Sequence, residues 1–359
     1  MSYISDTLTR DEFFKKVFAK SGSEDSRGQA EAALINLDRY SLSEYKKTTG
    51  EILKDLKNEP SKALRYLDRF NQWLTEEHEI DGKKVKPRHP RTIKQYFSVC
   101  RRYMKLCGGV RINDDDVKEY ITFPDLEADE EEAEPFEPKE LRLILDSTKE
   151  QRRKTMYMCK KDTGGRIKEM GQLQKQNFSF FGEYVEVTFP KAIVKGKHKT
   201  RRAFLTKETG QRVKLLLREL KDDDFVFKER DQTPIQFRDN EGHIFRTLLR
   251  DLGFTEKYQH NDRYKKNLHS IRAFCSTQYS LANNSEEAGH GYIGHKKYLE
   301  QYVRLSDEQK IERFRRAEAK LSLYDEIVVV EPNIEEMVTK RVDEVIRKLR
   351  SMGLLSDLV

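Results

Sequence analysis

Apolar residues in the first third of the chain recur in steps of three and four, the spacing that places side chains on one face of a helix. Three such stripes are present: Leu34, Leu37 and Tyr40; Leu64, Leu67, Phe70, Trp73 and Leu74; and Ile93, Tyr96, Phe97, Cys100, Tyr103, Met104 and Leu106. Thr92 is a suitable N-cap for the third stripe, and Gly108-Gly109 would end it. Residues 1–125 are therefore predicted to be helical throughout, with these apolar residues as the core.

The pattern becomes mixed after residue 138. Pro138 is suited to the first turn of a helix in which Leu141, Leu143, Ile144 and Leu145 pack inward. Residues 184–189 alternate between apolar and polar side chains as a strand does, and Pro190 interrupts them. Residues 192–194 and 202–205 suggest a hairpin around 195–199. The predicted fold class is mainly α with a small β-sheet or hairpin.

An acidic, proline-terminated stretch after residue 126 has few apolar residues and is typical of an exposed linker. We therefore predict a helical N-terminal domain over 1–125, a linker over 126–137 and a second domain over 138–325. Residues 326–359 would add a C-terminal helix. This helix would either mediate oligomerisation or fold back on its own domain. Its apolar positions have the four–three spacing of a short coiled coil: Val338, Val342, Val345, Leu349 and Met352.

The chain has 359 residues and a net charge of +7, which is unevenly distributed. No acidic residue lies between Lys83 and Lys105, and a block of one sign favours a polyanionic partner such as nucleic acid. The candidate DNA-binding residues in this block are Lys83, Lys84, Lys86, Arg88, Arg91, Lys94, Arg101 and Arg102.

Several classes of protein do not fit the sequence. No apolar run approaches the roughly 20 residues of a membrane span, and the first residues lack the pattern of a signal peptide. We expect a soluble cytoplasmic protein without a membrane partner. The four cysteines lie far apart, in neither metal-ligand nor disulfide spacing, so we expect thiols in a reducing compartment and no metal site.

Separated segments of the chain carry side chains suited to breaking a phosphodiester bond without a metal. His269 and Arg272 are three residues apart, so a helix would project both from one face. Arg166 follows two glycines and would begin a helix, where backbone amides also favour an anion. Guanidinium groups suit the transition state because their planar fork pairs two phosphate oxygens and stays protonated.

The remaining roles need a nucleophile and an acid. Tyr302 could attack the phosphorus and form a phosphotyrosyl bond, with Tyr298 as an alternative. A lysine on the hairpin around 195–199 could protonate the leaving 5′-hydroxyl. His295, after Gly294, offers a second imidazole for the phosphate.

The motifs follow one another along the chain at residues 163–170, 195–205, 268–272 and 293–295, and a tyrosine comes soon after. Taken together and in this order, they resemble the tyrosine recombinase (phage integrase) family. The resemblance covers about 140–305, and the basic helical region before it resembles the family's core-binding domain. It implies that Arg166 and Arg272 clamp the phosphate and that Glu169 supports the site. It also implies that His269 accepts a proton or binds phosphate, and that His295 binds a phosphate oxygen.

Two positions depart from the simplest match. Lys197, with Arg202 five residues on and a short apolar strand after it, fits the family's hairpin lysine best, and Lys195 is the reserve. The family's tyrosine position falls on Arg304 here. Tyr302 lies seven residues after His295 and precedes a polar break, so it is the favoured nucleophile, with Tyr298 kept as the alternative.

The resemblance implies a two-domain clamp on double-stranded DNA, acting as a homo-oligomer, a tetramer on recombination sites. It would integrate or excise a mobile element, of an archaeal or viral type, without metal, nucleotide or other cofactor. Three alternatives stay open. They are a type IB topoisomerase, a DNA-binding or architectural protein of the same fold that does not cleave, and a metal-dependent nuclease.

Overall fold

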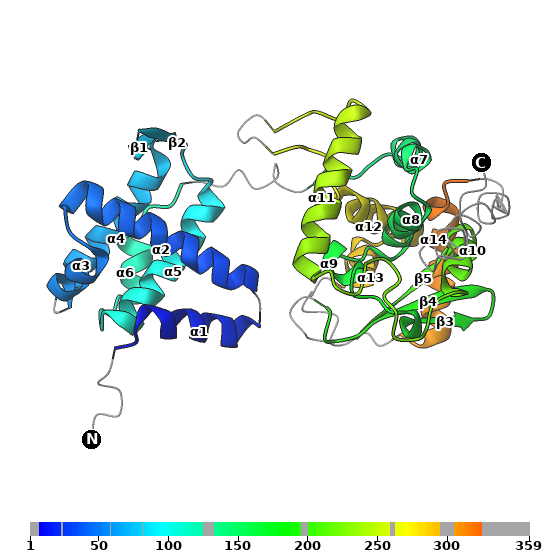
Figure 1. Cartoon of the computed structure of the whole chain (residues 1–359), viewed down its shortest axis with the longest axis horizontal. Coiled ribbons are helices and arrows are strands. Elements are labelled where there is room, and N and C mark those ends of the chain that lie inside the picture. Colours follow the sequence, from blue (N-terminus) through cyan, green and yellow to red (C-terminus); the bar gives the residue numbers. More distant parts are fainter. Residues whose placement is uncertain are drawn as a thin grey trace, which may run out of the picture. The chain divides into compact units, whose positions relative to one another are not determined.

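The chain forms two compact units in a computed structural model, Met1–Glu131 (the N-terminal unit) and Glu132–Val359 (the C-terminal unit) (Figure 1). The structure describes residues 7–22, 24–57, 59–80, 82–124, 133–194, 200–258, 263–294 and 305–324. Both units are mainly helical, and each contains one small antiparallel sheet, which confirms the predicted fold class. None of the described helices is long and apolar enough to cross a membrane.

The N-terminal unit is a helical bundle with a short hairpin. Its elements are α1 (Arg10–Ser21), α2 (Glu24–Tyr45), α3 (Thr49–Leu56), α4 (Pro60–Thr75), β1 (His78–Ile80), β2 (Lys83–Val85), α5 (Pro90–Cys107) and α6 (Asp114–Tyr120). Helix α2 packs against α1, α4 and α5, and the three predicted apolar stripes supply much of the core. The rings of Tyr40, Phe70 and Trp73 meet there, with centroids 5.4–6.2 Å apart.

The prediction that residues 1–125 are helical throughout is wrong between α4 and α5. Strands β1 and β2 pair antiparallel, with Ile80 opposite Lys83. Gly82 between them has a φ of 73°, which suits glycine, and a two-residue Asp-Gly turn is a strong signal for a hairpin. Each strand has only three residues, too few for alternation to show in the sequence.

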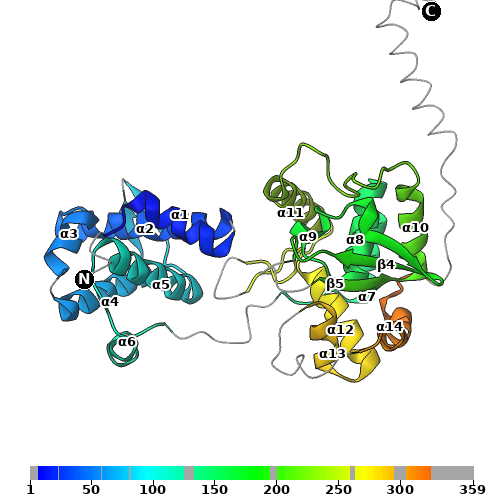
Figure 2. The same ribbon diagram turned by 90° about the horizontal axis from the view of Figure 1, so that it is seen from below.

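The C-terminal unit arranges its helices around a three-stranded sheet (Figure 2). Its elements are α7 (Pro138–Ser147), α8 (Gln151–Thr163), α9 (Ile167–Met170), η1 (Lys175–Asn177), β3 (Phe178–Phe181), β4 (Tyr184–Phe189), β5 (Arg201–Leu205), α10 (Lys207–Leu217), α11 (Pro234–Asp251), α12 (Ser270–Asn283), α13 (Glu286–Tyr292) and α14 (Asp307–Leu321). Helix α12 packs on α8, α13 and α14, and α8 and α10 both contact β5. The last turn of α8 therefore lies where the helices and the sheet meet.

The strands run in the order β3-β4-β5, with Phe189 of β4 opposite Arg201 of β5. The arms of the hairpin are thus β4 and β5, and the expectation of a strand at 192–194 is wrong, because these residues form turns after Pro190. The expectation that Leu143 packs inward is also wrong. It is 47% exposed, because one face of α7 takes up Leu141, Ile144 and Leu145.

Candidate active site

The turn that follows α8 has no space for side chains larger than hydrogen. Gly164 ends the helix with a left-handed φ of 61°, and a Cβ built on it would collide with Ile293. A Cβ on Gly165 would lie 2.6 Å from Met170 Sδ. The two glycines therefore let the backbone turn tightly under the segment that ends α13, and they place Arg166 at the start of α9.

Arg166 is held by Glu169, three residues on. The Arg166 backbone N–H donates to Glu169 Oε2 at 2.9 Å, and Arg166 Nη1 donates to Oε1 at 3.0 Å. Burial by itself raises the pKa of Glu169, but the charges of Arg201 and Arg166 and the backbone bond outweigh it, so the pKa lies below its usual value. The carboxylate is therefore ionised and orients the guanidinium. Arg166 keeps about a quarter of its side chain exposed to solvent.

Arg272 lies on the first turn of α12 and is 1% exposed. Its fork joins two segments of the site, because Nη1 donates to Gly164 O and Nη2 donates to Ile293 O at 2.8 Å. The buried Nε–H has no hydrogen-bond partner among the described residues. Burial, reinforced by the charges of Arg166 and Arg201, lowers the pKa of Arg272 to about 9. Arg272 therefore stays cationic at neutral pH, in surroundings that favour an arriving anion.

His269 is the N-cap residue of α12 and is exposed, whereas Arg272 three residues later is buried. The predicted pair thus consists of one side chain in contact with solvent and one inside the unit. A cavity of about 360 Å³ lies beside this helix start, between α11 and the segment that leads to Leu268. Its lining includes four basic side chains: His243, Arg246, Arg250 and Lys266.

The segment after α13 reaches the site through Ile293 and Gly294. Gly294 has a φ of 79°, and a Cβ built on it would lie 2.9 Å from Arg201 Cδ. The five predicted site residues that lie outside the described part of the chain are Lys195, Lys197, His295, Tyr298 and Tyr302. Their roles stay predictions.

Arg201, which the sequence reading did not select, is part of the same cluster. Its side chain is 9% exposed, and Nη1 donates to Thr163 O at 2.6 Å. Nη2 lies 3.5 Å from Glu169 Oε2, and the guanidinium sits 3.9 Å from the centroid of the Phe189 ring. Strand alternation does not identify it, because residues 203–205 are all apolar and buried, so both faces of β5 give the same signal.

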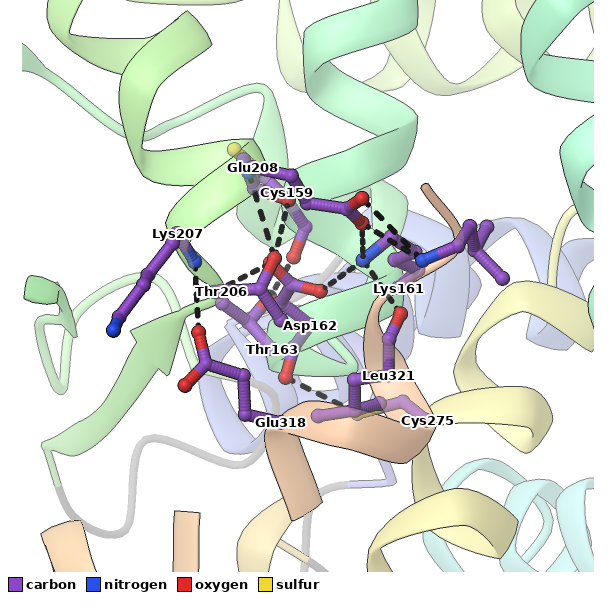
Figure 3. A network of polar contacts seen from close by, with 12 residues as sticks. Cys159, Lys161, Asp162, Thr163, Thr206, Lys207, Glu208, Cys275, Glu318 and Leu321 are labelled. Carbon is purple, nitrogen blue, oxygen red and sulfur yellow. Dashed lines mark hydrogen bonds and ion pairs between the residues drawn. The ribbon is translucent and has the colours of Figure 1, made fainter. Parts of the chain in front are cut away.

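A buried ionic network supports the end of α8 beneath the turn (Figure 3). Lys161 Nζ lies 2.6 Å from Asp162 Oδ1 and 2.8 Å from Glu208 Oε1, and it donates to Leu321 O at 2.8 Å. Asp162 Oδ2 accepts the backbone N–H and the hydroxyl of Thr206, each at 2.9 Å. Burial alone lowers the pKa of Lys161, but the two carboxylates outweigh it and raise the pKa above its usual value.

The same network ties the end of α14 to its own unit. Glu208 accepts the backbone N–H groups of Leu323 and Tyr324 at 3.1–3.3 Å, and the Tyr324 hydroxyl donates to Asp146 at 2.7 Å. The apolar face of α14 is buried on the unit, at the positions that its spacing predicts: Ile311, Phe314, Ala317 and Leu321. Residues 305–324 are thus docked within the chain that carries them.

Replacing Lys161 with methionine is expected to lower the free energy of unfolding by about 3–5 kcal/mol, because two buried carboxylates lose their shared cation. Lys207→Met is the matched control. Lys207 pairs with Glu183 at 2.8 Å where both side chains are about half exposed, and such pairs contribute at most about 1 kcal/mol. Urea denaturation of the two variants measures the difference. Equal losses would contradict the role assigned to Lys161.

The side chains of the basic block of the N-terminal unit differ in their exposure to solvent. Lys84, Lys86, Arg91 and Lys94 are exposed, although Lys84 also lies 3.1 Å from Glu77. Arg101 is occupied inside the unit, where Nη1 pairs with Asp114 at 2.6 Å and the guanidinium donates to Ile112 O. Arg88 donates to Asn36 and Arg102 is half-buried, while the side chain of Lys83 lies outside the described part. DNA contact by these residues stays a prediction.

The described ranges contain no group of side chains that could bind a metal ion together. No cluster of three or more His, Cys, Asp or Glu side chains is placed there to hold a metal ion.

Comparisons with known proteins bear on the fold. The structure of the Tn1549 transposon integrase in complex with transposon right end DNA aligns with a TM-score of 0.53 and 14% identity, covering 86% of this chain and 99% of that one. The XerH site-specific recombinase bound to a palindromic difH substrate aligns with a TM-score of 0.52 and 15% identity, covering 86% and 89%. No curated protein matches the chain.

The fold is therefore that of the two-domain tyrosine recombinases. Residues 134–309 match the model of the phage integrase family. This range includes every sequence motif that resembles the family. Residues 134–309 therefore form a phage integrase family domain.

Proposed function

We propose that the chain is a site-specific recombinase that acts on double-stranded DNA. The observation that carries this proposal is the unpaired Nε–H of Arg272, a buried donor beside a second arginine, Arg166. Burying a guanidinium donor without a partner is costly, and a phosphodiester oxygen would supply the partner. Arg166 remains partly exposed and can reach the same anion from solvent.

The reaction forms one bond and breaks one at the same phosphorus. The Tyr302 oxygen attacks, the phosphotyrosyl bond forms at the 3′ side, and the bond to the 5′-oxygen breaks. His269 accepts the phenolic proton, and Lys197 donates a proton to the leaving 5′-oxygen. Arg166, Arg272 and His295 stabilise the charge on the non-bridging oxygens. A 5′-hydroxyl of a partner strand then reverses the steps, which needs neither metal nor ATP.

DNA as the partner is supported by charge and by similarity. The Tn1549 integrase and XerH structures are complexes with DNA. In this chain the cavity next to Leu268 has His243, Arg246 and Arg250 in its lining, and the N-terminal unit exposes several lysines and arginines suited to phosphate contacts. We further propose that the protein acts as a tetramer in the cytoplasm and integrates or excises a mobile or viral element.

The test is covalent capture of the protein on DNA. Purified full-length chain is incubated with nicked duplexes from its own element, in the presence of a chelator, and resolved on a denaturing gel. The proposal expects a labelled adduct that survives denaturation and disappears with protease. Duplex binding without any adduct would overturn it in favour of an architectural protein of the same fold.

Two further outcomes separate the enzyme classes. Relaxation of supercoiled plasmid with an adduct but no recombinant joints would indicate a type IB topoisomerase. Cleavage that stops when the chelator is added would indicate a metal-dependent nuclease. Joint molecules between two duplexes that share the site, formed with chelator present, support the recombinase.

A further inference from the structure

Lys160, one residue before the ionic network, is a second buried lysine with a different partner. It is 1% exposed, and its Nζ donates to Gly165 O at 2.7 Å. Lys161 beside it reaches the two carboxylates Asp162 and Glu208, whereas no carboxylate lies within ion-pair distance of Lys160 among the described residues. The chain thus keeps a lysine amino group inside the protein, where its contact is with one backbone carbonyl.

That carbonyl belongs to the turn that carries the arginine site. Arg272 Nη1 binds the Gly164 carbonyl and Lys160 Nζ binds the next carbonyl along the chain, so side chains from α12 and α8 hold consecutive peptide groups. The following N–H, that of Arg166, is held by Glu169. The Gly165 N–H donates to Thr163 Oγ1, so both peptide groups between Gly164 and Arg166 have a fixed partner at each end. The Lys160 contact is one of these four, which together position the backbone of Arg166.

The charges around Lys160 come from two neighbouring segments. Burial is the main reason that the pKa of Lys160 is lowered to about 7, and the charge of Arg272 on α12 adds to it. Arg166 lowers the pKa further, while Glu169 on α9 and Cys275 on α12 act in the opposite sense. A phosphate bound between Arg166 and Arg272 would cancel part of their positive charge. The pKa of Lys160 would then rise, because these charges are one cause of its low value.

We propose that Lys160 is a positioning residue of the phosphate site, which holds the Gly164–Arg166 turn and takes up a proton when an anion binds at Arg166 and Arg272. The proton comes from solvent and rests on Lys160 Nζ, so no bond in the substrate changes. The inference rests on the proposed function only in placing the anion at the two arginines. Tighter anion binding at low pH follows, because binding and protonation favour each other.

Sulfate is the probe, because it matches phosphate in shape and does not titrate near neutral pH. In full-length protein labelled with ¹³C-lysine, the Lys160 εCH₂ resonance is followed by NMR against pH, with and without sulfate. We expect a lysine that titrates near pH 7 without sulfate, and at higher pH with it. Each unit of that increase corresponds to about a tenfold loss of sulfate affinity between low and high pH. Lys160→Met identifies the resonance and should reduce the pH dependence of sulfate affinity by the part that Lys160 contributes, while the part that the site's histidines contribute remains.

The controls separate this role from a structural one. Lys160→Arg keeps a donor but stays charged, so it should retain the folded turn and lose only the part of the pH dependence that Lys160 contributes. In Arg272→Gln, sulfate should no longer move the lysine titration. The proposal is overturned if every lysine titrates near its usual pH, or if sulfate leaves the Lys160 titration unchanged in the wild type. A sulfate-sensitive Lys160 in a chain that forms no DNA adduct would overturn the recombinase and leave this inference standing.

Discussion

Replacing Tyr302 with phenylalanine is expected to abolish the covalent protein–DNA adduct completely. The phenolic oxygen is the atom that bonds to phosphorus in the proposed reaction, and phenylalanine offers no nucleophilic atom in its place. Binding to duplex DNA should persist, because the basic side chains are unchanged. The measurement is the denaturing-gel assay with nicked duplex, together with a gel shift of the same duplex to show that the variant still binds.

Both ends of the segment that contains Tyr302 are held by neighbouring residues of β5. Gly294 lies against Arg201, and Asp307, the first residue of α14, pairs with Arg202 at 2.8 Å. Arg201 also contacts Glu169 and Thr163, so Gly294, the last described residue before the segment, lies close to the arginine site.

Tyr298→Phe is the matched control, since it also removes one tyrosine hydroxyl from this segment. It should keep the adduct. Tyr292 is a weaker candidate, because its ring stacks on Tyr279 at 4.0 Å and its hydroxyl donates to Phe204 O within the unit. An adduct that is lost in Tyr298→Phe and kept in Tyr302→Phe would reassign the nucleophile and leave the rest of the site in place.

The parts of the site that were predicted from sequence are those that local chemistry determines. Two glycines before Arg166 indicate a tight turn at a helix end, and the structure shows Gly164 in the left-handed conformation that ends α8. The strand at 184–189 and the helix that begins near 138 follow from alternation and from proline placement in the same way. These signals lie within a few residues of the features that they predict.

The parts that could not be predicted depend on partners far away in the chain. All residues from Thr155 to Thr163 of α8 are buried, polar and charged ones included. A polar residue in this helix therefore does not mark a solvent-facing side, and the sequence does not indicate where the lysines point. The direction of Lys161 is decided by Glu208 and Leu321, which come from α10 and α14. Likewise, His269 and Arg272 share a spacing, but the helix begins between them, so one is exposed and the other buried.

Replacing Arg272 with glutamine should lower the rate of adduct formation by at least about 10²–10³-fold, the usual loss when one preorganised donor to a transition-state oxyanion is removed. The loss has two sources in this structure. The Nε–H available to the phosphate disappears, and so does the fork that joins Gly164 O to Ile293 O. Arg272→Lys should be nearly as inactive, because one ammonium cannot span both carbonyls and still bind the anion.

Stability has to be separated from catalysis in this test, and Arg153→Gln provides the comparison. Arg153 lies at the opposite end of α8, where its guanidinium pairs with the buried Glu241 at 2.9 Å. Its loss should destabilise the same unit while the Gly164–Arg166 turn keeps all its contacts. Adduct formation below the unfolding temperature should therefore persist in Arg153→Gln and fail in Arg272→Gln. If both variants lose activity in proportion to their loss of stability, Arg272 serves the fold, and the unpaired Nε–H is not a phosphate ligand.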